Sequence, residues 1–416
     1  MELDLTKIKK VFFIGIGGIG ISALAKLAIS RGIEVVGLND DESKETLEPL
    51  RQQGVEIFFL KDFKELPQAN MYVYSDAWLF RGPEIIENAK KTGTPVLSYF
   101  EALAEFAKNY KVLAISGTHG KTTTTAMVAE ILVSAGLDPT VIVGSFVKSF
   151  GSNFRSGKGE YLVVEADEFA RHMLFFKPYV GAVTNIEVDH LDTYKDLEDI
   201  KNTFAKFLSQ SEIKISENDY EKFLPLVPKL QVPGEHNRKN AACAFAVAQI
   251  LGIDDHVTSL ALHNFAGTWR RLENRGTLAS GTIVYDDYAH HPSEIRASLQ
   301  ALRELYPKGE KKIYVLFQPH MYNRTKAFFK EFSESFVLAD EVGFLPIFYA
   351  REAPDPEVSS EKLSNEVEKF QGNSHYLPDF DSAEKYFREA NFGPDDIFVT
   401  MGAGLAYKVG DNLMKI

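Results

Sequence analysis

The sequence predicts an α/β protein with three doubly wound domains in series. Short apolar runs alternate with segments of helical periodicity along almost the whole chain, which is the pattern of strands and helices in α/β domains. Two of the apolar runs end in glycine-rich turns, at residues 15–20 and 117–120, that lead directly into predicted helices. A chain of 416 residues is also too long for one ordinary domain. We expect domains at 1–109, 110–267 and 268–416.

Composition and charge narrow the classes of function. A hydrophobic content of 45% is sufficient for packed cores, and a net charge of −12 argues against nucleic acid or an anionic membrane as the main partner. The single cysteine, Cys243, excludes an internal disulfide and a cysteine metal cluster, which fits a reducing cytoplasm. Residues 11–29 are apolar but interrupted by glycines, so they predict neither a signal peptide nor a membrane span. A cytoplasmic protein is expected.

The first glycine-rich turn predicts a site for a nucleotide. Gly15, Gly17 and Gly20 fit the pattern GxGxxG between a predicted strand and a predicted helix. Such a turn lets a phosphate approach backbone amides at a helix start, and an acidic residue after the next strand can bind ribose; here Asn39 and Asp40 follow that strand. The pattern is only moderately specific. A structural turn without a ligand and an NAD-dependent dehydrogenase therefore remain alternatives.

The other elements are expected from apolar periodicity and from breaker residues such as Pro83, which suits the first position of a helix. In the first domain we expect helices at 43–52, 83–91 and 99–108 and strands at 11–14, 33–38, 56–59, 71–74 and 95–97. In the second we expect strands at 112–115, 139–143, 160–165 and 180–184 and helices at 121–135, 197–209 and 238–251. In the third we expect strands at 282–286, 311–317, 339–345 and 395–400 and helices at 293–304, 323–336, 380–390 and 404–414. Residues 211–230 look irregular and predict a shortened connection.

The second glycine-rich turn, GTHGKTTTT, predicts a nucleoside triphosphate site. It places backbone amides and a helix N-terminus around an anion, with Lys121 as the counter-charge and Thr122 offering a hydroxyl to a metal ion. The full GxxxxGK[ST] pattern is not present, because Ile115 stands where the first glycine belongs. A threonine-capped helix after a glycine turn is the alternative.

Acidic and imidazole side chains follow the next two strands of this domain. Glu165, Asp167 and Glu168 come at the end of one strand, and His190, flanked by Asp189 and Asp192, follows the other. Open α/β sheets bind ligands at the carboxyl ends of their strands, and hard cations prefer oxygen ligands. Glu165 is therefore suited to hold Mg²⁺ beside the nucleotide, and His190 could complete the metal shell or hold a carboxylate.

Further polar motifs follow in the last part of the chain. PGEHNRKN precedes an alanine-rich helix, which Asn237 could also simply cap. TWRRLE, YDDYAHHPSE and FQPHMYNRT each lie at a strand end or a domain entry, where arginines could stabilise a transferring phosphoryl group and His with Arg could hold a carboxylate. His320 and Arg324 are spaced to share one side of a helix's first turn, and Arg324 could bind a carboxylate with two hydrogen bonds.

Together the motifs resemble one known family. GTHGKTTTT, EADE, TNIEVDHLDTY, PGEHNRKN, RRLE, DDYAHHPSE and FQPHMYNRT occur in the order found in the Mur ligases of peptidoglycan synthesis, and the resemblance runs from GIGGIGISALA to the MGAG at 401–404. It implies a Rossmann-like N-terminal domain for a UDP-sugar, a P-loop ATPase-like central domain and a Rossmann-like C-terminal ligase domain. The resemblance is strongest to the branch that uses ATP and Mg²⁺ to join L-alanine to the lactyl carboxylate of UDP-N-acetylmuramate through an acyl phosphate.

The resemblance also implies roles for individual residues. The UDP-sugar would be bound by Gly15, Gly17, Gly18, Ile19, Gly20, Asp40 and Ser75. ATP would be bound by Gly117, Thr118, His119, Gly120, Lys121, Thr122, Thr123, Asn237, Asn240, Arg271 and Asp287. The metal ligands would be Thr122, Glu165 and His190, and the catalytic residues Lys121, Glu165, His190 and Arg271. The amino acid would be bound by Tyr288, His290, His320 and Arg324.

Some positions depart from the family pattern, and some alternatives remain open. Met321 stands where some relatives carry a basic residue, so the amino acid would depend more on Arg324. Lys206 lies near the place of a carbamylated lysine in sister ligases, but this branch is not expected to need one. A recycling ligase that adds a preformed tripeptide to the same nucleotide sugar is the closest alternative. A non-catalytic nucleotide-binding protein is disfavoured by the set of Lys121, Thr122, Glu165 and His190. We expect a monomer or a homodimer.

Overall fold

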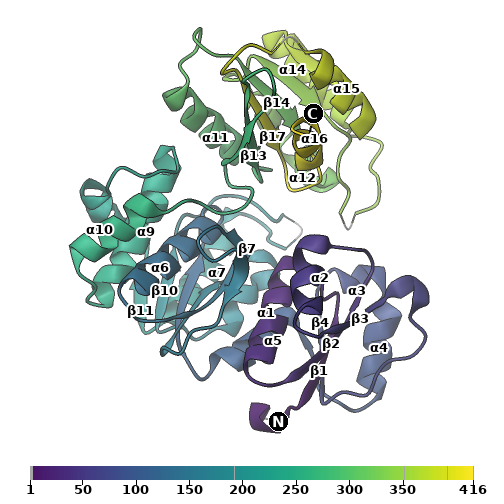
Figure 1. Cartoon of the computed structure of the whole chain (residues 1–416), viewed down its shortest axis with the longest axis vertical. Helices are drawn as coiled ribbons and strands as arrows, with labels where there is room; N and C mark the ends of the chain where they lie inside the picture. Colours follow the sequence, from purple (N-terminus) through teal and green to yellow (C-terminus); the bar gives the residue numbers. More distant parts are fainter. Residues whose placement is uncertain (1–2, 192, 351, 391, 416) are drawn as a thin grey trace. The chain divides into compact units, whose positions relative to one another are not determined.

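The computed structural model contains three β-sheets flanked by helices and describes residues 3–191, 193–350, 352–390 and 392–415 (Figure 1). Asp192, which the sequence placed beside His190, lies outside the described residues. The chain forms two compact units. One contains residues 1–188, 192–229 and 240–265, and the other contains 189–191, 230–239 and 266–416. The first two sheets belong to the first unit and the third sheet to the second unit.

The first sheet is parallel, with strand order β3-β2-β1-β4-β5. Its strands are β1 (Lys10–Ile14), β2 (Glu34–Asn39), β3 (Glu56–Phe59), β4 (Met71–Tyr74) and β5 (Val96–Ser98). Its helices are α1 (Ile19–Ser30), α2 (Lys44–Arg51), α3 (Trp78–Arg81), α4 (Pro83–Lys91) and α5 (Tyr99–Ala107). Successive strand residues face opposite sides, so Val11 and Phe13 pack with α1, α2 and α5, whereas Phe12 and Ile14 pack with α3 and α4.

The second sheet has the order β11-β10-β6-β9-β7-β8, and only its edge strand β8 runs antiparallel among the described pairs. The strands are β6 (Lys111–Ser116), β7 (Thr140–Val147), β8 (Ser152–Arg155), β9 (Tyr161–Glu165), β10 (Val180–Val183) and β11 (Ile213–Ile215). The helices are α6 (Lys121–Ser134), α7 (Leu197–Ser209), α8 (Glu217–Tyr220), α9 (Glu235–Ile250) and α10 (Asp255–Asn264), with 3₁₀ turns η3 (Phe169–Phe175) and η4 (Glu221–Leu226).

One hydrophobic core joins the first and second sheets. Buried residues of the first sheet and α1, such as Phe13 and Leu24, belong to the same cluster as Leu162 of β9 and Phe204 of α7. Apolar burial at about 25 cal/mol per Å² is the dominant favourable term in folding, so a shared core makes these two sheets one compact unit. The predicted boundary at 109/110 falls inside this unit, between α5 and β6.

The third sheet has the order β12-β13-β17-β14-β15-β16, parallel except for β12. Its strands are β12 (Glu273–Thr277), β13 (Ile283–Asp287), β14 (Ile313–Phe317), β15 (Glu341–Phe344), β16 (Ser374–Tyr376) and β17 (Ile397–Met401). Its helices are α11 (Pro292–Leu305), α12 (Tyr322–Ala327), α13 (Phe329–Ser333), α14 (Ser360–Gln371), α15 (Phe380–Glu389) and α16 (Tyr407–Leu413).

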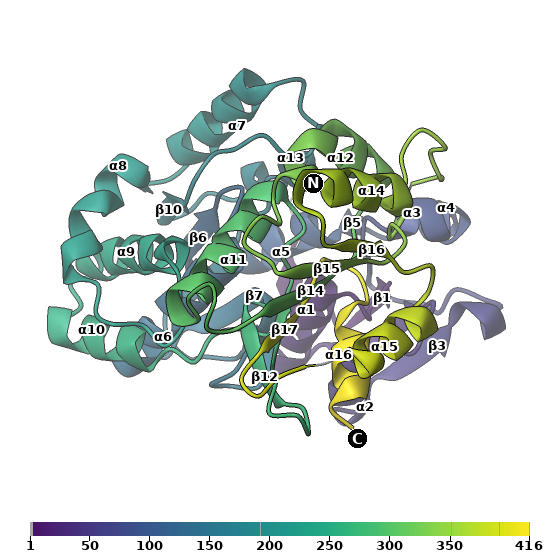
Figure 2. The ribbon, with the colours of Figure 1, turned by 90° about the horizontal axis from the view of Figure 1, so that it is seen from above.

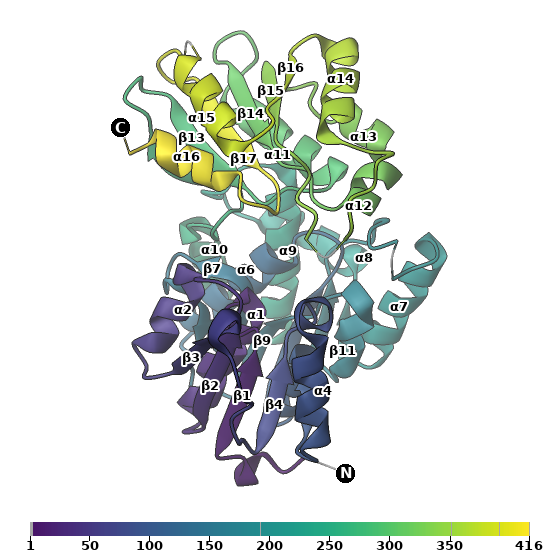
Figure 3. The ribbon, with the colours of Figure 1, turned by 90° about the vertical axis from the view of Figure 1, so that its right-hand side faces the viewer.

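Helices cover both faces of the third sheet, as Figures 2 and 3 show. Val315 and Phe317 of β14 pack with α11, α13 and α14, and Tyr314 and Leu316 pack with α15 and α16. A strand buried on both faces reads as a continuous apolar run, and IYVLF is such a run. The predicted α/β fold with doubly wound sheets is confirmed.

Two expectations about local structure, and the alternative that Asn237 caps a helix, were wrong. Residues 211–230 are not irregular: β11 pairs with β10, and a capping box of Ser216 and Asp219 starts α8. Those elements are too short to show a periodic pattern. The helix expected at 323–336 is two helices, because the backbone of Phe328 leaves the helical region between them. Asn237 does not cap its helix, since α9 begins at Glu235.

Several elements had not been expected from the sequence. They include α3, β8, β12, β16, α10 and α14. The three strands are short edge strands, in which apolar periodicity is weak. Among the described residues, no helix is both long and apolar enough to cross a bilayer.

A stability test of the third sheet uses two phenylalanines of different burial. Phe387 of α15 is fully buried against Phe398, whereas Phe370 of α14 is 57% exposed. Phe387→Ala should lower the free energy of unfolding of this part of the chain by about 3–5 kcal/mol, because it removes buried area and leaves a cavity. Phe370→Ala should change it by less than about 0.5 kcal/mol. Urea unfolding of both variants measures this, and equal losses would contradict the assigned core.

Candidate active site

The first glycine-rich turn is closely packed by the protein's own side chains. Gly15 has φ +84°, and a Cβ there would lie 2.3 Å from Nε1 of Trp78. The amide of Gly17 donates to Oδ1 of Asn39 at 3.0 Å, and a Cβ at Gly17 would overlap that side chain. Asn39, the last residue of β2, therefore stabilises the turn itself. The glycines are required by this packing as well as by any approaching phosphate.

The remaining residues predicted to bind the UDP-sugar lie around this turn. Gly18 caps α1 without a side chain, and Ile19 is the first residue of that helix. The backbone of Ser75, just beyond β4, donates to Ile14 O at 3.0 Å, which places it next to the turn. Asp40 forms an ion pair with Arg81. An acid that is already paired is a weaker candidate for a ribose ligand than the sequence alone suggested.

Strand β8 fixes α1 through a buried polar network. Nδ2 of the fully buried Asn153 donates to Ile19 O at 2.5 Å and to Ser22 Oγ at 3.0 Å. Its Oδ1 accepts from Nζ of Lys26 at 2.8 Å. Burial lowers the pKa of Lys26. The helix that follows the first glycine turn is thus held by the second sheet as well as by its own.

The second glycine-rich turn connects β6 to α6 and is held by the end of β10. Gly117 has φ +135° and Gly120 has φ +82°, backbone conformations that favour glycine. Thr184 Oγ1 donates to His119 O at 2.6 Å, and Asn185 Oδ1 accepts from the amide of His119 at 2.9 Å. These contacts fix the loop that presents Thr118, His119 and the start of α6 with Lys121, Thr122 and Thr123.

Lys121 is surrounded by acceptors. Its Nζ donates to the carbonyls of Gly117 at 2.7 Å and Thr118 at 3.0 Å and pairs with Glu168 Oε2 at 2.7 Å. Burial alone would lower the pKa of Lys121, but the carboxylates of Glu168, Asp167 and Glu165 raise it above its ordinary value. The ammonium therefore stays charged at the helix N-terminus, as a phosphate counter-charge must. Glu168, 3% exposed, is this partner, which the sequence analysis named only as one of three acids after a strand.

Thr122 and Glu165 are adjacent, as expected for two ligands of one metal ion. Thr122 Oγ1 lies 3.2 Å from Glu165 Oε2, and the amide of Gly144 donates to Glu165 Oε1 at 2.6 Å. A Cβ at Gly144 would overlap the carboxylate, so this glycine makes room for it. A hydroxyl and an oriented carboxylate beside the phosphate loop are oxygen donors of the kind that Mg²⁺ prefers.

Three other predicted ligands lie on α9 or in the second unit. Asn240 of α9 packs on the phosphate loop, because a Cβ at Gly120 would lie 2.1 Å from its Oδ1. Asn237 donates from Nδ2 to Pro233 O at 2.7 Å. His190 belongs to the second unit and has φ +52°, an uncommon backbone conformation for histidine.

The two arginines of TWRRLE have different environments. Arg270, 4% exposed, pairs with Asp286 at 2.8 Å and donates to the carbonyls of Gly402 at 2.6 Å and Gly404 at 2.9 Å. It therefore ties this segment to the MGAG turn and is structural. Arg271 is more exposed, with its guanidinium 5.0 Å from the ring centre of Tyr288. The sequence assigned the phosphate role to Arg271, the arginine that the fold leaves accessible.

Asp287, at the end of β13, is buried, and its carboxylate accepts hydrogen bonds from the protein itself. Its carboxylate accepts from the Ser298 hydroxyl and, at 3.2 Å, from the amide of Ala289. Burial raises the pKa of Asp287 to about 6, despite the nearby Arg271. These contacts stabilise the loop that carries Tyr288 and His290.

The four residues predicted to bind the amino acid form one continuous group. The ring centres of Tyr288 and His290 are 5.4 Å apart and those of His290 and His320 are 5.9 Å apart. Nη1 of Arg324 lies 3.2 Å from Nδ1 of His320. Burial lowers the pKa of His290 to about 4, so this imidazole is neutral at pH 7.

Arg324 is not a solvent-exposed helix arginine. It is 8% exposed, and its Nε and Nη2 donate to Oδ1 of Asp189 at 3.2 Å and 3.1 Å. Burial opposes ionisation of Asp189, but the guanidinium holds the pKa of that carboxyl below its ordinary value. Asp189 was noticed in the sequence only as a neighbour of His190. With Nε and Nη2 on Asp189, the third nitrogen, Nη1, contacts Nδ1 of His320.

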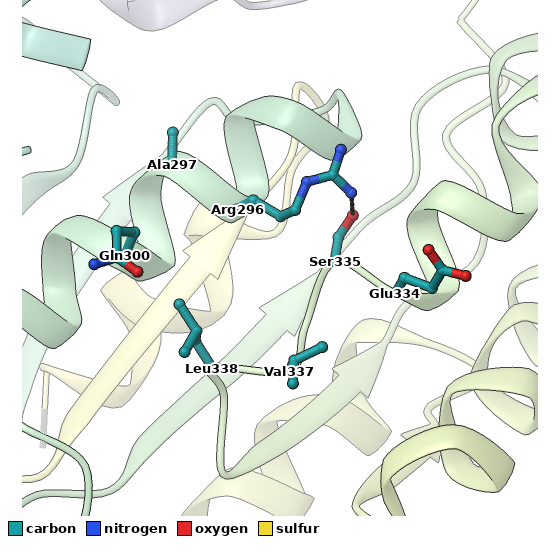
Figure 4. Close-up of a pocket in the computed structure, with 7 residues that line it drawn as sticks. All are labelled: Arg296, Ala297, Gln300, Glu334, Ser335, Val337 and Leu338. Atoms are coloured by element: carbon teal, nitrogen blue, oxygen red, sulfur yellow. Dashed lines mark hydrogen bonds between the residues drawn. The ribbon is translucent and has the colours of Figure 1, made fainter. Parts of the chain in front are cut away.

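A separate hollow on the third sheet's helices contains none of these residues. It has a volume of about 390 Å³ between α11 and the segment after α13, and Figure 4 shows Arg296 and Ser335 at its rim. Arg296 donates to Ser335 Oγ at 3.0 Å. The predicted site residues lie instead at the carboxyl ends of the strands, where ligands bind in open α/β sheets.

Comparison with known proteins identifies the family. Residues 10–111 match the domain described as Mur ligase family, catalytic domain, residues 115–226 match the Mur ligase middle domain, and residues 270–404 match the Mur ligase, glutamate ligase domain. The chain belongs to the Mur ligase family. The resemblance inferred from the motifs is confirmed.

Individual Mur ligases are similar over nearly the full length. A protein of Acetivibrio thermocellus named UDP-N-acetylmuramate–L-alanine ligase is 36% identical, with 99% of this chain and 97% of the relative covered. The crystal structure of UDP-N-acetylmuramate-alanine ligase from Thermotoga maritima has a TM-score of 0.82 at 27% identity and 98% coverage of both chains. A murein peptide ligase of Psychrobacter arcticus has a TM-score of 0.70 at 22% identity, with 98% coverage of both chains, and shares the fold.

Because Asp287 is buried, we predict that its contribution to the free energy of unfolding depends on pH. A carboxyl whose pKa is raised to about 6 in the folded Mur ligase binds its proton more tightly there than in the unfolded chain, where the pKa is about 3.9. Its contribution to stability is therefore complete below the lower value and is lost as the pH rises through the higher one. The stability of the wild type relative to Asp287→Asn should fall by about 2 kcal/mol between about pH 4 and about pH 7.

Urea unfolding of both proteins across this pH range measures the difference between their free energies of unfolding. The other titrating groups contribute equally to both proteins, so they do not affect this difference. A constant difference would show that Asp287 is ionised normally in the folded protein.

Proposed function

We propose that this Mur ligase joins L-alanine to the lactyl carboxylate of UDP-N-acetylmuramate, with conversion of ATP to ADP and phosphate, in the cytoplasm and as a step of peptidoglycan precursor synthesis. The observation that carries the proposal is the arrangement of Lys121, Thr122 and Glu165 on a phosphate loop, in a chain 36% identical to a named L-alanine ligase over 99% of its length. ATP-dependent amide ligation is the common chemistry of the family.

The proposed reaction has two steps. An oxygen of the lactyl carboxylate attacks the γ-phosphorus of ATP, the bond to the ADP oxygen breaks, and an acyl phosphate forms. The amine of L-alanine, after loss of a proton, attacks the acyl carbon, and the bond to phosphate breaks. The first step is needed because a carboxylate is a poor electrophile and phosphate is a good leaving group. The charge that develops on the phosphoryl oxygens requires fixed positive groups.

The phosphate loop supplies these groups. Lys121 is held by Glu168 and two carbonyls at the N-terminus of α6, so its ammonium is oriented before a nucleotide binds. The loop amides and the helix N-terminus favour the β- and γ-phosphates of ATP. We assign the loop residues 117–123, Asn237, Asn240, Arg271 and Asp287 to ATP, with Asp287 acting through the loop that it stabilises.

Thr122 and Glu165 fit a magnesium ion, and His190 is the proposed third ligand. The fit rests on the oxygen donors 3.2 Å apart and on the hydrogen bond from Gly144 that orients the carboxylate. When bound, Mg²⁺ neutralises phosphate charge.

The group of Tyr288, His290, His320 and Arg324 is proposed to bind L-alanine. Nη1 of Arg324 would donate to the alanine carboxylate, while Asp189 holds the rest of the guanidinium in place. We assign the UDP-sugar to Gly15, Gly17, Gly18, Ile19, Gly20 and Ser75, with Asp40 as a weaker candidate because of its pairing with Arg81. The domain boundaries at 109/110 and 267/268, and a monomeric or homodimeric state, remain predictions.

The function is tested by phosphate release with UDP-N-acetylmuramate, ATP and Mg²⁺, with L-alanine or the tripeptide L-Ala-γ-D-Glu-meso-diaminopimelate as acceptor. L-alanine should give rapid release, and the tripeptide should give little. Preference for the tripeptide would assign the protein to the recycling branch instead. No release with either acceptor would overturn the proposal.

Lys121→Ala should reduce this phosphate release at least about a thousandfold, because a charge partner of the transition state is lost. Binding of UDP-N-acetylmuramate, measured by calorimetry, should be nearly unchanged, since the first glycine turn is untouched. The exposed Lys158→Ala is the matched control and should keep wild-type kinetics. A Lys121→Ala enzyme with more than about a tenth of the wild-type rate would exclude the assigned role.

Arg324→Lys should raise the KM for L-alanine at least about tenfold, because lysine cannot bind Asp189 and a substrate carboxylate with the planar geometry of a guanidinium. The KM values for ATP and the UDP-sugar should change little. Arg388→Lys, an exposed arginine paired with Glu384 on α15, is the matched control. An unchanged alanine KM would mean that Arg324 serves only to bind Asp189.

A further inference from the structure

Tyr99 is a tyrosine of the first unit that the proposed reaction has not used. It is the first residue of α5, directly after the capping residue Ser98, and the capping box with Glu101 fixes the start of the helix. Its ring meets that of Phe100 edge-on at 4.6 Å, and Phe100 stacks on His172 of η3 at 4.1 Å. The position of the phenol is therefore set by the packing of α5 against both η3 and α1.

The hydroxyl end of Tyr99 lies against the first glycine turn. A Cβ at Gly20 would lie 2.9 Å from Cζ and 3.0 Å from the hydroxyl oxygen of Tyr99. Gly20 is the third glycine of the GxGxxG turn, and its lack of a side chain makes room for this phenol. Tyr99 thus reaches the turn that we assign to the UDP-sugar.

Tyr99 also lies beside the segment that follows β9, because α5 packs on η3, which comes directly after Glu165, Asp167 and Glu168 in the chain. Burial and the negative charges of Glu165 and Asp167 raise the pKa of Tyr99. At neutral pH the hydroxyl is therefore a proton donor. Glu165 is the carboxylate that we assign to Mg²⁺ beside the γ-phosphate, so Tyr99 lies near both the sugar-nucleotide turn and the phosphoryl-transfer site.

The hydroxyl of Tyr99 has no hydrogen-bond partner among the residues that the structure describes, although the side chain is partly buried. Two other tyrosines of the first unit do have one: Tyr72 donates to Pro67 O at 2.9 Å, and Tyr220 donates to Thr184 O. A polar group placed in a partly enclosed site without a protein partner is available to a ligand.

We propose that the Tyr99 hydroxyl is a substrate-binding group that donates a hydrogen bond to the lactyl carboxylate of UDP-N-acetylmuramate. This rests on the proposed function, in which that carboxylate must extend from the nucleotide turn to the phosphate loop. Next to two acids, a neutral donor binds an anion without adding negative charge. It also leaves the carboxylate oxygen nucleophilic, because the hydrogen bond is to a phenol and not to a cation.

The test is Tyr99→Phe, which removes only the hydroxyl, with Tyr72→Phe as the matched control. Calorimetry measures the Kd of each protein for UDP-N-acetylmuramate and for UDP-N-acetylglucosamine, which lacks the lactyl group. Tyr99→Phe should weaken binding of UDP-N-acetylmuramate about tenfold, the loss of one hydrogen bond to a charged group, and leave UDP-N-acetylglucosamine unchanged. Its Tm should match the wild type, whereas Tyr72→Phe should lower Tm and leave both Kd values unchanged.

Two results would overturn the inference. One is equal weakening of both nucleotide sugars, which would place the effect in the glycine turn itself. The other is unchanged Kd values, with or without a loss of Tm. A wild-type protein that releases no phosphate with any acceptor would refute the proposed function instead, so the two failures are distinguishable.

Discussion

The ion pair between Lys121 and Glu168 is the contact on which the phosphate loop depends. An ammonium enclosed by protein must be paired, because an uncompensated buried charge costs several kcal/mol. Glu168 and two loop carbonyls meet this need, and they also fix Nζ at the N-terminus of α6. The strand that ends at Glu165 delivers both this proposed metal ligand and, three residues later, the counter-ion of Lys121. The short segment EADE therefore positions two carboxylates with different partners, Glu165 beside Thr122 and Glu168 on Lys121.

The same requirement shapes the second unit. Arg270 and Arg324 are both buried, and each is matched by one aspartate: Asp286 for the first and Asp189 for the second. Arg270 uses its remaining donors on the carbonyls of the MGAG turn, so it has a structural role. Arg324 keeps Nη1 on His320, so it joins a structural pair to the group of residues proposed to bind the amino acid. The contacts of the remaining donors thus distinguish the two buried arginines, which the sequence alone does not.

The glycines of both turns are explained by contacts with the chain's own side chains. Trp78 fills the space beside Gly15, Asn39 that beside Gly17, and Asn240 that beside Gly120. Each turn is thereby compact before a ligand binds, and a fixed set of amides needs little reorganisation when a phosphate arrives. The hydrogen bonds from Asn153 to the first turn of α1 extend this rigidity from the second sheet to the first glycine turn.

The sequence by itself determined the α/β class, most strands and long helices, the two glycine turns and the family, because these depend on local periodicity and on motifs in a fixed order. It also singled out Lys121, Thr122 and Glu165 as candidate site residues, since each lies directly at the end of a strand or the start of a helix. Short elements such as β11 and β16 were missed because three residues carry no periodic signal. The tertiary structure alone decided which residues meet. Lys121 pairs with Glu168, Arg324 pairs with Asp189, and the ring of Tyr99 packs against Gly20. Those contacts join residues far apart in the chain, and burial in a shared core, which no local pattern encodes, brings them together.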